Sequence, residues 1–109
     1  METGIELITK ERQRQIDIKG YTAHHDAEHS VTELIDAAMS YVDAARTDYM
    51  NETKGLHPEV LKQHYDTIKQ LTWRWDDNSF KPTTSFKDLI KAGALIAAAI
   101  DRLQNENIN

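Results

Sequence analysis

Apolar side chains recur every three or four residues along most of this chain, and that spacing commits the chain to helices. Within residues 31–45, for example, Val31, Leu34, Ala38 and Tyr41 fall on one side of a helix. Only two prolines and four glycines interrupt the 109 residues, and no long segment alternates apolar with polar side chains. The sequence therefore predicts an all-α fold.

Four helices are predicted, each from a start or stop signal. The first covers residues 5–19 and ends at Gly20, which suits a left-handed C-terminal cap. The second follows Ser30 and ends before Asn51; Ser30 and Glu33 form a capping box. The third begins at Pro58, a favoured first helical position, and the fourth at the cap sequence 85–88, with Ser85 as its N-cap and Asp88 in place of glutamate.

The buried faces of the last two helices are predicted from the same spacing. They comprise Leu61, Tyr65, Ile68 and Leu71 in the third helix, and Phe86, Leu89/Ile90, Gly93, Ile96/Ala97, Ile100 and Leu103 in the fourth. Small residues between positions 92 and 99 would let another helix approach closely. We therefore expect the fourth helix to be central or to lie at a subunit contact, and the protein to form a homo-oligomer.

Short connections between these helices favour a small four-helix bundle with antiparallel neighbours, joined by a polar histidine-rich connector and an aromatic connector. We expect one domain over residues 1–109, with a frayed tail at about 105–109. The longest apolar stretch, residues 92–100, is too short to span a bilayer, and residues 1–4 do not begin a signal peptide. The expected location is the cytoplasm.

The amino-acid composition narrows the classes of function that are open to this chain. Thirteen basic against eighteen acidic residues give a net charge of −5, which argues against binding duplex nucleic acid through its phosphates. The absence of cysteine excludes disulfides and thiolate metal sites. A local basic pocket remains compatible with this balance.

A histidine–carboxylate cluster is the densest concentration of reactive side chains. If residues 22–33 formed one helix, His25, His29 and Glu33 would share a face with Asp26 beside them, a ligand set that suits zinc, manganese or iron. Helical carboxylate pairs such as Glu33 and Asp36 can also hold Mg²⁺. The alternative is a polar connector whose histidines form hydrogen bonds. Candidate ligands from other segments are Glu11, His64 and Asp88.

The aromatic connector suggests a different site. Trp73 and Trp75 offer flat surfaces for stacking a base, and Arg74, Lys81 and Lys91 offer charge for an anion. In an extended loop both indoles would lie on one side and Arg74 on the other. The alternative is that the tryptophans close the end of the bundle as part of the core.

The sequence resembles two known protein families, and each resemblance adds an expectation about function. Glu33-Leu34-Ile35-Asp36 is similar to one half of the motif of MazG-type all-α nucleotide pyrophosphohydrolases, although Asp88-Leu89-Ile90-Lys91 lacks the second carboxylate of the other half. The whole chain resembles a family of small phage and prophage proteins, from which it departs at Tyr21 and Ala27. The matching segments are Glu11–Ile16, Lys19–Thr22, His25-Asp26-x-x-His29, Glu33-Leu34, Trp73-x-Trp75, Phe80–Pro82 and Leu89–Ala97.

The family resemblance implies an accessory protein in the cytoplasm of a bacterial host. Our leading hypothesis is a homo-oligomeric bundle that binds a nucleotide-like or other anionic small ligand through Trp73, Arg74, Trp75, Lys81 and Lys91. One alternative is a metal-dependent nucleotide pyrophosphohydrolase that uses zinc, manganese or magnesium. The other is an inhibitor that binds a host protein through its acidic surface.

Overall fold

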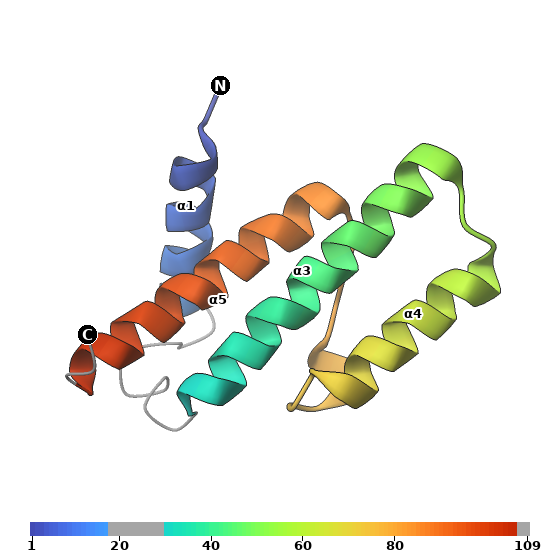
Figure 1. Ribbon diagram of the computed structural model, residues 1–109. Helices are drawn as coiled ribbons and strands as arrows, with labels where there is room; N and C mark the ends of the chain where they lie inside the picture. Colours follow the sequence, from blue (N-terminus) through green and yellow to red (C-terminus); the bar gives the residue numbers. More distant parts are fainter. Residues whose placement is uncertain (18–29, 107–109) are drawn as a thin grey trace.

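The computed structural model describes residues 1–17 and 30–106, and this part of the chain is all-α (Figure 1). The elements are α1 (Gly4–Asp17), α3 (Val31–Lys54), α4 (Pro58–Leu71), the short 3₁₀ helix η1 (Asp77–Ser79) and α5 (Ser85–Asn105). The prediction of a small four-helix bundle is confirmed. The predicted cap at Gly20 lies outside the described residues.

The two long helices, α3 and α5, form the centre of the bundle. They run antiparallel and make the most extensive contact between elements (Figure 1). Helix α4 returns along α3, and α1 packs on α5. In the described part of the chain, no helix combines the length and hydropathy needed to cross a lipid bilayer.

Helix caps explain where the long helices begin and end. Ser30 accepts a hydrogen bond from the backbone N–H of Glu33 at 3.1 Å, as predicted. Helix α3 continues to Lys54, beyond the predicted end before Asn51, because Gly55 supplies the stop: its φ is 73° and its N–H donates to the Asn51 carbonyl. Helix α5 has Thr84 as its N-cap, not Ser85.

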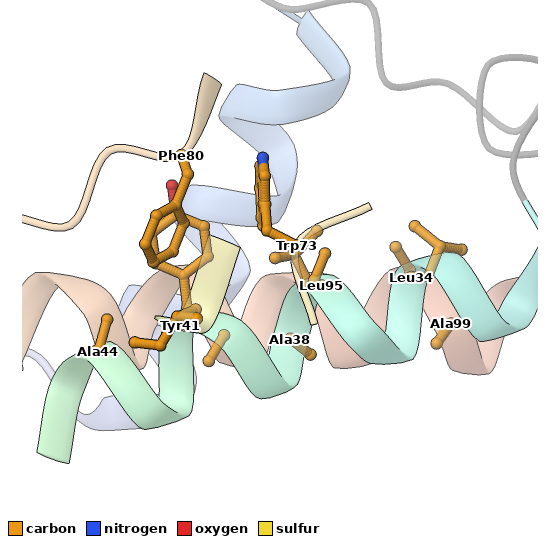
Figure 2. Packing of buried hydrophobic residues seen from close by; sticks show 12 residues of the cluster. Leu34, Ala38, Tyr41, Ala44, Trp73, Phe80, Leu95 and Ala99 are labelled. Carbon is orange, nitrogen blue, oxygen red and sulfur yellow. The ribbon is translucent and has the colours of Figure 1, made fainter. Parts of the chain in front are cut away.

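The interface between α3 and α5 is built mainly from alanine. These buried alanines let the two backbones approach closely, and larger side chains such as Tyr41 and Leu95 fill the remaining space (Figure 2). The prediction that α5 is central is therefore confirmed, since it contacts both α1 and α3. The alanines of this buried cluster are Ala37, Ala38, Ala44, Ala92, Ala98 and Ala99.

The predicted buried face of the fourth helix is largely wrong. Phe86, Leu89, Ile96 and Ile100 are exposed, and the alanine face next to them is buried instead. The spacing rule cannot choose between two adjacent apolar faces, and the slimmer face allows the closer helix contact. In α4, Leu71 is also exposed, whereas Ile68 is buried as predicted.

At Gly93, α5 is in close contact with α1. A Cβ atom at this position would lie 2.5 Å from Cδ1 of Ile8. The absence of a side chain therefore lets Ile8 rest directly on the α5 backbone. This contact helps to set the distance between α5 and the residues of α1 that follow Ile8.

Replacing Gly55 with alanine should lower the free energy of unfolding by about 1 kcal/mol, because a Cβ atom is strained at positive φ. Urea denaturation followed by circular dichroism measures this change. Gly4→Ala is the matched control, since Gly4 lies within α1 with open space around it. Equal stability of the Gly55 variant and the wild type would contradict the proposed role of the cap.

Candidate functional site

The connector between α4 and α5 is held in a defined shape by hydrogen bonds. Asp76 caps η1 by accepting from the N–H of Asn78, and its carbonyl accepts from the indole Nε1–H of Trp73 at 2.9 Å. The N–H of Lys81 donates to the hydroxyl of Tyr41 at 3.0 Å. This hydrogen bond therefore joins the connector to α3 at a point that follows the two tryptophans in sequence.

The aromatic side chains of this connector pack into one cluster with Tyr41. The Trp73 ring lies edge-on to Tyr41, with a centroid separation of 5.6 Å, and its centroid is 5.0 Å from that of Phe80 (Figure 2). The Trp75 ring lies edge-on to Trp73, with centroids 5.2 Å apart. Trp73 is only 6% exposed. It therefore contributes to the core, as one of the two sequence interpretations expects, and this packing fixes the position of Trp75 beside it.

A small cavity adjoins this cluster and is enclosed by four parts of the chain. Its volume is about 50 Å³, which is room for a few water molecules or one compact polar group. The lining side chains are Glu11 and Gln15 from α1, Tyr41 from α3, Trp73, Trp75 and Ser79 from the connector, and Lys91 and Leu95 from α5.

Lys91 supplies the cationic group of the cavity. Its Nζ donates to the carbonyl of Lys81 at 3.0 Å and lies 5.2 Å from the centroid of the Tyr41 ring. These contacts hold the ammonium group in place, and the electron-rich ring face favours a positive charge there. The cavity thus contains a positioned cation beside the Tyr41 ring, and the Glu11 carboxylate also belongs to its lining.

Gln15 supplies an unsatisfied acceptor. Its side chain is 4% exposed, and its amide Nε2 lies 3.5 Å from Oε2 of Glu11. Its Oε1 is buried without a hydrogen-bond donor among the described residues. Glu11 is in turn held by Arg14 through two hydrogen bonds of 2.8 and 2.6 Å. A buried carbonyl oxygen without a donor is costly, so this position is suited to a group that carries an N–H or O–H.

The structure brings together three of the five residues predicted to bind the ligand, namely Trp73, Trp75 and Lys91. Arg74 points elsewhere: its Nε is 3.1 Å from Oδ2 of Asp36, in an exposed ion pair. Lys81 contributes its backbone, while its side chain is exposed.

Gln15 and Glu11 were not predicted to belong to this site, because the run from Lys10 to Gln15 is typical of a solvated helix face. One signal was present in the sequence. Gln15 stands seven residues after Ile8, two helical turns along the same face, and the half-buried Ile8 packs on Gly93. A polar residue on the packed face of a helix is a candidate for a buried contact.

The predicted metal site can be followed only in part. His25, Asp26 and His29 lie outside the described residues. Glu33 is described, and its Oε2 accepts from the Trp75 indole at 3.1 Å. Within residues 1–17 and 30–106, no group of three or more histidine or acidic side chains is placed to hold a metal ion.

A buried pair of carboxyl groups joins α3 to α5. Asp48 is 4% and Asp88 0% exposed, and Oδ2 of each is buried without a hydrogen-bond donor among the described residues, so a proton held between the two carboxyl groups would satisfy both. The phenol of Tyr65 donates to Oδ1 of Asp48, and the N–H of Thr83 donates to Oδ1 of Asp88 at 2.9 Å. A carboxyl–carboxylate hydrogen bond requires one shared proton. This pair was not predicted, since forty residues separate its members in sequence.

The environment of this pair favours the protonated form. Burial, together with the hydrogen bond to Asp48, raises the pKa of Asp88 to about 7. Burial and the contact with Asp48 also raise the pKa of the Tyr65 phenol. Both carboxyl groups are buried, and the pair links α3 to α5.

Comparison with known proteins gives no assignment. No protein-family model, curated protein or solved structure matches this chain. The functional argument therefore depends on the cavity itself.

The free energy of unfolding should fall as the pH rises from 4 to 7, because folded Asp88 keeps a proton that the unfolded chain releases near its ordinary pKa of 3.8. Between pH 5 and pH 8 the expected loss from this group is on the order of 2–3 kcal/mol. Urea denaturation at several pH values measures it.

The variant Asp88→Asn should remove most of this dependence, since its amide can donate to Asp48 without a titrating proton and its Oδ1 can still accept from Thr83. Asp77→Asn, at an exposed position in η1, is the control and should keep the wild-type dependence. The same pH dependence in the Asp88 variant would show that the pair does not hold the proton.

Proposed function

We propose that this protein is a binding protein for a small anionic ligand of the nucleotide type, and that the cavity between α1, α3, α5 and the aromatic connector receives the charged group. One observation carries this proposal: the Lys91 ammonium, the indole of Trp75 and the unsatisfied amide oxygen of Gln15 line the same cavity. They come from three separate segments of the chain.

The chemistry of the lining favours a ligand with two kinds of group. Lys91 favours an anion such as a phosphate or carboxylate, and Oε1 of Gln15 favours a neighbouring hydroxyl or amine. A volume of about 50 Å³ accommodates such groups but not a whole nucleotide. The remainder of the ligand would therefore lie outside the cavity, next to the half-buried Trp75.

In keeping with the resemblance to phage and prophage proteins, we propose that the ligand is captured in the cytoplasm of a bacterial host. A pyrophosphohydrolase with a metal bound by His25, Asp26, His29 and Glu33 remains the enzymatic alternative. Purification without chelator followed by elemental analysis tests it. An inhibitor that binds a host protein would need no cavity, so loss of function in cavity variants separates it from the proposal.

Replacing Lys91 with methionine should weaken ligand binding by about 10- to 100-fold, the usual effect of losing one charge-assisted hydrogen bond. Isothermal titration with adenosine monophosphate, adenosine diphosphate and pyrophosphate measures the affinity. Fluorescence of Trp75 gives a second readout, because its indole lines the cavity.

Lys87→Met is the matched control, since Lys87 is exposed on the same helix. It should bind as the wild type does. Adenosine without phosphate should bind far more weakly than the charged compounds. Equal binding of adenosine, or no binding of any anion by the wild type, would refute the proposed function.

Gln15→Leu should act in opposite directions on stability and on binding. Removing a buried acceptor without a donor should raise the free energy of unfolding of the ligand-free protein by about 1 kcal/mol. The same change should weaken binding, because the ligand loses its acceptor. Thermal denaturation with and without ligand measures both effects. A variant that loses stability and binds normally would assign Gln15 to the core alone.

A further inference from the structure

Helix α3 carries a row of exposed apolar side chains on the side away from the cavity. Ile35, Met39, Val42, Arg46 and Tyr49 follow one another at intervals of four, three, four and three residues. The four apolar members are 44%, 52%, 46% and 59% exposed. This spacing is that of the a and d positions of a coiled coil, whose seam faces another helix.

Helix α5 continues this apolar surface. Ile96 and Ile100 are about half exposed, and together with Leu103 they form the facing wall of a groove between α3 and α5. The groove has a volume of about 610 Å³, and Ala38 and Ala99 lie among its lining residues. Exposed apolar surface of this extent, concentrated in one groove, marks an interaction site.

We propose that this groove is a homodimer interface, in which the α3 row of each copy enters the groove of the other. The row has the self-complementarity that a two-fold interface requires. Reversed about Val42, it places Ile35 opposite Tyr49 and Val42 opposite itself, and it brings Met39 to within one residue, about 1.5 Å along the axis, of the aliphatic stem of Arg46. An antiparallel crossing of the two α3 helices at Val42 therefore matches apolar groups throughout.

Charge complementarity favours a second copy over an unrelated partner. Asp43 and Arg46 both line the groove, and among the described residues neither forms an ion pair within its own chain. In the antiparallel crossing, Arg46 of one copy lies over Met39 of the other, one turn from that copy's Asp43. The symmetry produces this contact twice, with opposite charges each time.

The available area is compatible with a dimer. The apolar row of α3 covers residues 35–49, about 21 Å of helix, and two packed helices are about 20 Å wide. The apolar centre of the face is then roughly 400 Å², about half of the ~800 Å² per partner of a standard interface, and the polar residues around it would supply the rim. This proposal does not rest on the proposed ligand, because the cavity is lined by other residues.

Sedimentation velocity over a wide range of protein concentration tests the proposal. The wild type should be a dimer, and Val42→Glu should raise the dissociation constant by about 100-fold or more, because two carboxylates would meet at the two-fold axis. Val60→Glu makes the same change at a comparably exposed position on α4 and should leave the dimer intact. Circular dichroism checks that both variants fold.

A charge-exchange experiment tests the pairing itself. Asp43→Arg and Arg46→Asp should each weaken the homodimer, because each places like charges opposite one another twice. Mixing the two variants should restore dimerisation, because the heterodimer has two opposite-charge contacts. Repulsion between charges within one helix would not be relieved by mixing, so it cannot explain this recovery. A monomeric wild type, a dimer unaffected by Val42→Glu, or no heterodimer on mixing would each overturn the proposal.

Discussion

The close contact between α3 and α5 is the interaction on which the rest of this protein depends. Alanine on both helices brings the backbones near enough for Asp48 and Asp88 to share a hydrogen bond across the interface. The same contact has room for only a few larger side chains such as Tyr41 and Leu95, and other large apolar side chains, among them Ile35, Val42, Ile96 and Ile100, remain on the outer faces of the two helices. The buried interior and the exposed groove thus both result from the packing of α3 against α5 through their alanine faces.

The aromatic connector combines a structural and a binding contribution. Trp73 completes the core and donates to the Asp76 carbonyl, so the loop has a defined conformation. Trp75, two residues later, lies at the cavity and donates to Glu33. The two interpretations of these indoles, core residue or ligand contact, therefore apply to different residues of the pair. Rigid packing of the first indole gives the second a fixed position.

The sequence predicted the helices well because apolar spacing and capping residues are local signals. Ser30 and Pro58 begin helices as expected, whereas the end of α3 was placed too early because Gly55, four residues beyond Asn51, was not recognised as the stop. The choice of buried face was harder, since α5 has an alanine face beside a face of larger apolar residues. The spacing rule allows either face to be the buried one, and contact with the partner helix determines which face is buried.

The site was predicted less completely for a different reason. Trp73, Trp75 and Lys91 were chosen by residue type, and the structure places them together. Gln15 and the Asp48–Asp88 pair depend on the register between distant helices, which no local pattern contains. Arg74 illustrates the converse: its residue type suits an anion, but its position next to Asp36 gives it an ion pair instead.

Tyr41 and Val42 are consecutive residues of α3 that face in different directions. The ring of Tyr41 forms part of the cavity wall, and Val42 forms part of the groove. A rotation of α3 about its own axis would therefore move both surfaces together and by the same angle. Mechanical coupling between the cavity and the groove requires no intermediate residue, because two consecutive residues of one rigid helix line them.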